Sequence, residues 1–148
     1  MPMTKLKMNI EFEYATGNCP IASDQVITWV NAALATETDG ATELAIRVVD
    51  ADESQELNAT FRGKNYPTNV LSFPADVQLP EGPTLLGDIA ICLPVVEQEA
   101  SEQSKHFEQH FAHMVIHGCL HLMGYDHDND DDADAMEAKE IGILANLG

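Results

Sequence analysis

The chain has 148 residues, a length that suits a single domain over residues 1–148 with room for a substantial hydrophobic core. Its formal net charge is −18, from 25 Asp and Glu against seven Lys and Arg, which excludes nucleic-acid binding through a broad basic surface but not through a local basic site. The sequence contains no run of 18 apolar residues and no apolar signal segment, so we expect a cytoplasmic protein without a membrane span.

Hydrophobic periodicity in the first half of the chain predicts strands that alternate with helices. Alternating apolar and polar side chains indicate strands, whereas apolar residues at helical spacing, as from Val26 to Leu34, indicate a helix. In chain order we expect a strand over 8–14, a turn over 17–20, a helix over 21–36, a strand over 42–50, and a short helix from Asp52, its N-cap, to about Phe61.

The second half predicts two strands and then three helices. Gly63 and Pro67 indicate a loop, and Pro94 suits the first turn of a helix. In chain order we expect a strand over 70–73 ended by Pro74, a loop over 75–84, a strand over 86–93, a helical region from Pro94 to Met123 with a break near Ser104 and its end at Gly124, and a last helix over 131–146. Together these elements predict an α+β fold, with a small mixed sheet of about four strands packed with about five helices.

Three cysteines are present, and their odd number and the absence of a C-x-x-C pair predict reduced, partly buried thiols rather than disulfides. Cys119 lies within a histidine-rich stretch, but on a helix it points about 200° away from both His117 and His121. We therefore expect its side chain to face the core.

Residues 126–140 hold eight carboxylates and one lysine. A calcium loop that started at Asp126 would have Asp131 at its sixth position, where an EF-hand needs glycine. The stretch is instead typical of a solvated helix face with an acid-rich N-terminus, which the helix dipole stabilises.

The stretch HGCLHLMGYDH, residues 117–127, has the spacing of a metal site. His117 and His121 are one helical turn apart, and Gly124 lets the chain turn back so that His127 can reach the same ion. Three neutral imidazoles leave a fourth position open, as in catalytic zinc sites. His113, one turn before His117, is expected near the ligands, whereas His106 and His110 are expected to face solvent.

The same spacing occurs in zinc peptidases of the metzincin type, but those carry a glutamate after the first histidine, where this chain has Gly118. That glutamate is the general base of peptide hydrolysis. Asp126 could partly replace it, although a loop carboxylate here is better suited to orienting a ligand histidine or capping the next helix.

Two further segments accompany HGCLHLMGYDH: LNATFRGKNYPTNVLSFP at residues 57–74 and LLGDIAIC at residues 85–92. Together the three segments resemble the bacterial YbeY family of metal-dependent endoribonucleases, and the resemblance runs from the helix near residue 52 to the end of the chain. It implies a compact α+β domain with one zinc ion held by His117, His121 and His127. It also implies a role in activity for Arg62.

The resemblance further implies a single-strand-specific ribonuclease that matures the 3′ end of 16S ribosomal RNA and assists ribosome quality control. Its expected partners are single-stranded ribosomal RNA, the small ribosomal subunit and assembly proteins. A guanidinium at Arg62 could stabilise charge on a phosphodiester during cleavage, and Lys64 is a candidate RNA contact. The attacking group, water or the ribose 2′-OH, stays open.

Two other functions are compatible with parts of the sequence. The histidine spacing also fits a metallopeptidase of zincin-like geometry, which Gly118 disfavours. A non-catalytic, zinc-containing ribosome-assembly factor would use the same histidines structurally. Three imidazoles suit nickel, copper or iron as well as zinc, so the sequence leaves the metal open, together with the oligomeric state.

Overall fold

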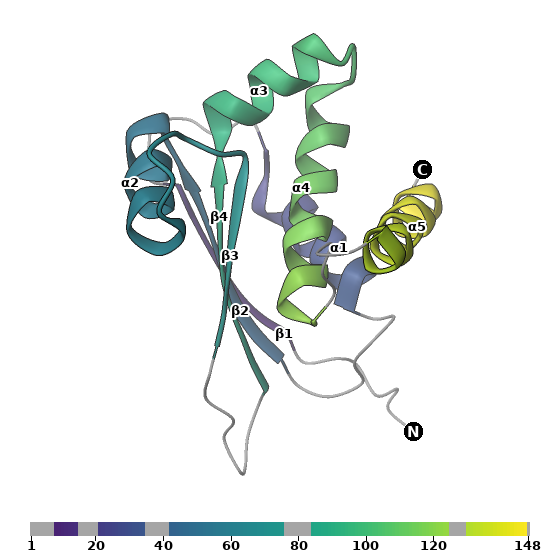
Figure 1. The fold of residues 1–148 in the computed structure, drawn as a ribbon. Helices are drawn as coiled ribbons and strands as arrows, with labels where there is room; N and C mark the ends of the chain where they lie inside the picture. The colour runs from purple at the N-terminus through teal and green to yellow at the C-terminus, as the bar shows by residue number, and fades with distance from the viewer. Residues whose placement is uncertain (1–7, 15–20, 35–41, 76–83, 125–129, 148) are drawn as a thin grey trace, which may run out of the picture.

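A computed structural model describes residues 8–14, 21–34, 42–75, 84–124 and 130–147 of the chain (Figure 1). The turn expected at 17–20 and most of the loop expected at 75–84 lie outside these residues. None of the described helices has the length and apolar character needed to cross a membrane.

The strands form a four-stranded mixed sheet in the order β1-β2-β4-β3. β1 pairs parallel to β2, β2 pairs parallel to β4, and β3 pairs antiparallel to β4. β3 is therefore an edge strand, which matters below because it lies beside the histidine helix. The strands are β1 (Met8–Tyr14), β2 (Thr42–Val49), β3 (Val70–Pro74) and β4 (Thr84–Cys92).

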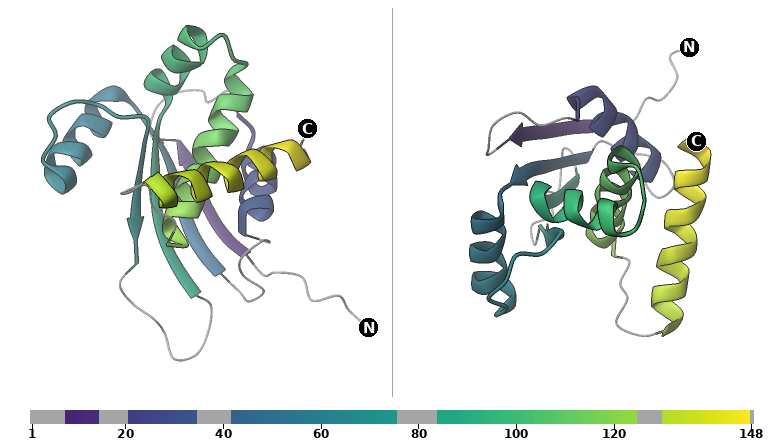
Figure 2. Two further views of the ribbon diagram at one scale, coloured as in Figure 1. Left: turned by 45° about the vertical axis from the view of Figure 1, so that its right-hand side comes forward. Right: turned by 90° about the horizontal axis from the view of Figure 1, so that it is seen from above.

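Helices cover both sides of this sheet. α4 contacts β3 and β4 and packs against α1, α3 and α5, while α2 lies on the opposite side of the sheet (Figures 1 and 2). The described helices are α1 (Ser23–Leu34), α2 (Ala51–Arg62), α3 (Leu93–Glu102), α4 (Phe107–Leu122) and α5 (Asp130–Leu147). The predicted α+β fold, with its order of strands and helices, is confirmed.

Local chemistry explains several helix ends. Pro94 lies in the first turn of α3, and Ser104, with a φ of 55°, breaks the chain between α3 and α4, both as predicted. Gly124 has a φ of 102° just after α4, a conformation that favours glycine. The predicted cap of α2 was wrong: Asp50 is the N-cap and accepts from the Glu53 amide at 2.8 Å, while Asp52 lies in the first helical turn.

α4 is almost entirely buried, and its position organises the site. From His110 to Leu122 the residues that are not buried are His113, His117 and His121, which lie one turn apart along one stripe. The rest of the helix surface packs on the sheet and on neighbouring helices. Its buried hydrophobic residues include Phe111, Val115, Ile116, Cys119 and Leu120.

Cys119 faces this core, as predicted, and burial raises the pKa of its thiol to about 12. Burial likewise raises the pKa of Cys92, at the end of β4. Both thiols therefore stay protonated at neutral pH. Neither is paired in a disulfide.

Gly118 lies where α4 packs closely on β4. A Cβ placed there would lie 3.0 Å from Cγ2 and 3.1 Å from Cδ1 of Ile89 on β4. A larger residue at this position would require the Ile89 side chain to move by a few tenths of an ångström, and its Cβ would point at the sheet. Glycine at position 118 is therefore explained by packing.

Gly118→Ala is expected to destabilise the protein by about 1–3 kcal/mol, because the added methyl group overpacks the contact with Ile89. Urea unfolding of the metal-free protein measures this change. Gly142→Ala on α5 is the matched control: its Cβ would meet open space, so the helix propensity of alanine should leave it neutral or stabilised by up to about 1 kcal/mol. Equal stability of Gly118→Ala and the wild type would refute the close-packing explanation.

Candidate active site

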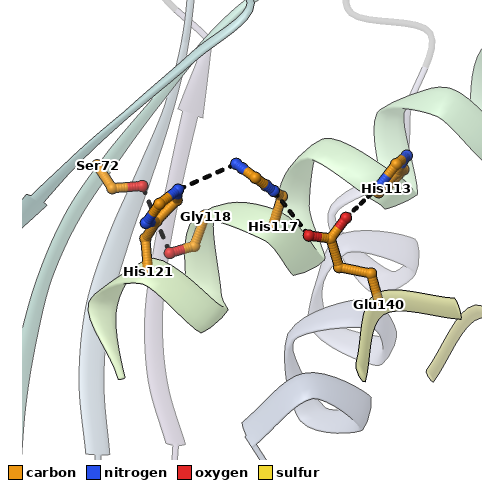
Figure 3. Close-up of polar contacts among 6 residues, drawn as sticks. All are labelled: Ser72, His113, His117, Gly118, His121 and Glu140. Atoms are coloured by element: carbon orange, nitrogen blue, oxygen red, sulfur yellow. Dashed lines mark hydrogen bonds and ion pairs between the residues drawn. The ribbon is translucent and has the colours of Figure 1, made fainter. Parts of the chain in front are cut away.

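His117 and His121 present their ring nitrogens to each other. Their Nε2 atoms lie 3.0 Å apart, and both side chains are partly exposed (Figure 3). Two imidazole ligands of a tetrahedral zinc, each at about 2.0–2.1 Å from the ion, would be roughly 3.3 Å apart. The observed separation is close to that value, so this pair fits a shared metal ion.

The third predicted ligand, His127, and the nearby Asp126 lie outside the described residues. Within the described ranges, no group of three or more His, Cys, Asp or Glu side chains is arranged to hold a metal ion. The structure thus brings two of the three predicted ligands together. The complete three-histidine site stays a prediction.

Glu140 of α5 is a site residue that the sequence did not predict. One of its carboxylate oxygens accepts from Nε2 of His113, and the other accepts from Nδ1 of His117 at 2.8 Å (Figure 3). The residue is 6% exposed. Burial tends to raise its pKa, but the hydrogen bonds from His113 and His117 outweigh burial and lower the pKa to about 2. Glu140 is therefore ionised at neutral pH.

This finding corrects the prediction that residues 126–140 form only a solvated acidic face. Glu137 is exposed as expected, but Glu140 lies on the same side of α5 as the buried Met136 and Ile143. Those three residues are spaced four and three positions apart, which places them on one helix face. A carboxylate within an apolar stripe was the signal that could have identified it.

The three histidines before His117 have different surroundings in the structure. His113 contacts Glu140. His110 was expected to face solvent, which is wrong: it is 3% exposed, and its Nε2 lies 3.0 Å from a carboxylate oxygen of Glu99 on α3. Glu99 in turn accepts from the amide of Asn69. His106 is exposed and precedes the helix.

Arg62 is the last residue of α2 and is exposed. Its guanidinium donates to the backbone carbonyl of Ser72 on β3 at 3.4 Å. The hydroxyl of Ser72 donates to the backbone carbonyl of Gly118 at 3.4 Å (Figure 3). The end of α2 is thus connected through the edge strand to the turn of α4 that carries His117 and His121.

The loop that carries Lys64 is held by two buried polar residues of α2. Asn58 donates to the carbonyl of Tyr66 at 2.8 Å, and the Ser54 hydroxyl donates to the carbonyl of Thr68 at 2.9 Å. Lys64 itself is exposed. The sequence patterns did not single out Ser54 and Asn58, because their partners are backbone groups of a loop with no regular pattern.

A cavity of about 830 Å³ lies between α2 and the sheet. Its lining includes Arg47, Leu57, Phe61, Phe73 and Asp88, and it contains none of the histidines. This cavity is therefore separate from the histidine site, and the chemistry of the side chains, rather than the cavity, identifies the candidate site.

A family model and two relatives match most of the chain. The family model described as Endoribonuclease YbeY matches residues 10–148. The chain is 54% identical to the Endoribonuclease YbeY of Stutzerimonas stutzeri (strain A1501) over 136 residues, which cover 90% of this chain and 83% of the relative. It is 44% identical to the Endoribonuclease YbeY of Cellvibrio japonicus (strain Ueda107) over 146 residues, which cover 99% of this chain and 82% of the relative.

The fold has a solved counterpart as well. The solution structure of TM1509 from Thermotoga maritima is similar with a TM-score of 0.63 and 32% sequence identity, and the match covers 91% of this chain and 86% of that one. The family match spans nearly the whole chain, including Arg62 and the stretch from His117 to His127. The chain belongs to the endoribonuclease YbeY family and is a hydrolase that acts on RNA.

Proposed function

We propose that residues 1–148 form a zinc-dependent, single-strand-specific endoribonuclease domain that acts in 3′-end maturation of 16S ribosomal RNA and in ribosome quality control. One zinc ion would be held by His117, His121 and His127. The observation that carries the metal assignment is the convergence of the Nε2 atoms of His117 and His121 at 3.0 Å. The family match supports RNA as the substrate.

The residues around the site have distinct roles in this proposal. The bound metal would act as a Lewis acid on a phosphodiester oxygen. Arg62 would stabilise negative charge that develops on the phosphate, since its planar fork can donate to two oxygens. Lys64, in the adjacent loop, would contact the RNA backbone. With so few basic groups, binding would be weak and local, so the small ribosomal subunit and assembly proteins would supply specificity in the cytoplasm.

The geometry disfavours the peptidase alternative. A Cβ at position 118 would lie 3.0 Å from Ile89 on β4, so a side chain there would start in a tight contact and point at the sheet. Glu140 does not replace the peptidase glutamate, because both its oxygens contact histidines and it lies on the Nδ1 side of His117, whereas the metal would lie on the Nε2 side. The described residues thus hold no carboxylate in the position of the peptidase base.

Cleavage of matched RNA substrates tests the proposal. We expect the zinc-loaded protein to cut a single-stranded RNA internally, to leave the same sequence intact as a duplex, and to leave casein intact. The ends of the products then identify the nucleophile: a 2′,3′-cyclic phosphate indicates the ribose 2′-OH, and a 5′-phosphate indicates water. Cleavage of casein with no cleavage of RNA would overturn the proposed substrate.

A further inference from the structure

Glu140 is the one buried Asp or Glu among the residues whose side chains the structure describes. Removing a carboxylate from water is costly unless hydrogen bonds or opposite charges compensate for the lost hydration. Here the compensation comes from His113 and His117, which lie one turn apart on α4. The carboxylate and the two rings therefore form one connected unit, which we call the Glu140 clamp.

The clamp determines which nitrogen of His117 is available to a ligand. An ionised carboxylate only accepts hydrogen bonds, so Nδ1 of His117 must carry the proton in the contact with Glu140. In a neutral ring this leaves the lone pair on Nε2. That nitrogen faces Nε2 of His121 at 3.0 Å. The hydrogen bond to Glu140 thus selects the tautomer of His117 whose lone pair is on Nε2, the nitrogen that faces Nε2 of His121.

The other oxygen of Glu140 has its own partner. Its contact with His113 restrains rotation of the carboxylate, which would otherwise be free to turn away from His117. The backbone of α5 is held as well, because Met136 is buried one turn before Glu140 and Ile143 is buried one turn after it. Figure 2 shows α5 lying across α4 and α1, both of which it contacts.

We propose that Glu140 is a positioning residue of the metal site, which fixes the tautomer and the ring orientation of His117, and that His113 acts by holding Glu140. The C-terminal helix α5 is then part of the site, although it contributes none of the predicted metal ligands. This inference rests on the proposed metal site. Hydrogen-bond partners of metal-bound histidines in other proteins act in this way, and their loss typically lowers metal affinity by about 10–100-fold.

The test replaces the carboxylate with an amide of the same shape. In Glu140→Gln one of the two histidines faces the NH₂ group of the amide. This group donates hydrogen bonds and cannot accept one from the N–H of that histidine. We expect this variant to bind Zn²⁺ about 10–100-fold more weakly than the wild type, as measured by competition with a chromophoric chelator. The visible absorption spectrum of the Co²⁺-loaded protein should also change. His113→Gln should produce a smaller loss in the same direction.

The matched control is Glu137→Gln, which removes one negative charge from an exposed position of the same helix. It should bind Zn²⁺ like the wild type and give the wild-type Co²⁺ spectrum. Urea unfolding of each metal-free variant separates positioning from folding: a purely structural role would lower stability while leaving the Co²⁺ spectrum of the folded protein unchanged.

Each result of these measurements supports or overturns the role proposed for Glu140. Weaker Zn²⁺ binding and an altered Co²⁺ spectrum in Glu140→Gln, with wild-type behaviour in Glu137→Gln, support the clamp. Wild-type affinity and spectrum in Glu140→Gln would overturn it while leaving the metal site intact. Failure of the wild-type protein itself to bind Zn²⁺ or Co²⁺ would overturn the metal site and the clamp together.

Discussion

His117→Ala is expected to abolish metal binding and RNA cleavage together. His117 takes part in two contacts of the site: its Nε2 faces His121, and its Nδ1 contacts Glu140. Removing it deletes a proposed ligand and also releases one side of the Glu140 clamp. The loss of affinity should therefore exceed the roughly 10–100-fold typical of a partner outside the ligand set. Metal content after gel filtration and the rate of single-stranded RNA cleavage measure the two effects.

His106→Ala is the control for this variant. It removes the same side chain from an exposed position just before α4, so metal content and cleavage should match the wild type. Because the His117 side chain is 22% exposed, its truncation opens no sealed cavity, and the metal-free variant should remain folded. Retention of one bound metal and of wild-type cleavage in His117→Ala would remove His117 from the site.

Arg62→Glu is expected to leave the protein folded and loaded with metal but to lower RNA cleavage by about 10²–10³-fold. That factor is the usual cost of deleting one donor that stabilises charge in a transition state. Arg62 is exposed, and its hydrogen bond to the Ser72 carbonyl is long at 3.4 Å, so the fold should tolerate the change. Single-turnover cleavage, metal content and urea unfolding of the same preparation measure the three properties.

Two further variants separate the role of the guanidinium from that of charge. Lys105→Glu makes the same charge reversal at another exposed position and should cleave RNA like the wild type. Arg62→Lys keeps the charge but loses the planar fork, so intermediate activity is expected. Loss of metal or of folding in Arg62→Glu would show that Arg62 supports the structure instead.

The order of the strands and helices was predictable because each depends on neighbours in the sequence. The repeat of apolar residues around Val26 and Val30 marks α1, and Pro94 and Ser104 mark the limits of α3. The orientation of Cys119 followed from helical geometry alone. The confirmed break at Ser104 is also a local feature, since this residue, at positive φ, lies between α3 and α4.

The features that the sequence did not predict depend on contacts between distant parts of the chain. His110 was expected to face solvent, but it is buried, and α3 supplies Glu99, which contacts its ring. Glu140 was assigned to an acidic surface because composition does not show which single carboxylate turns inward. The reason for Gly118 was likewise hidden, since only the packing of α4 on Ile89 reveals it.

A zinc titration of the metal-free wild-type protein tests the central claim most directly. The initial rate of cleavage of a labelled single-stranded RNA is measured as zinc is added in fractions of an equivalent. The three-histidine site predicts no cleavage without metal, a linear rise, and a plateau at one zinc per chain. Full cleavage by the metal-free protein, or no cleavage at any zinc concentration, would contradict a zinc-dependent ribonuclease.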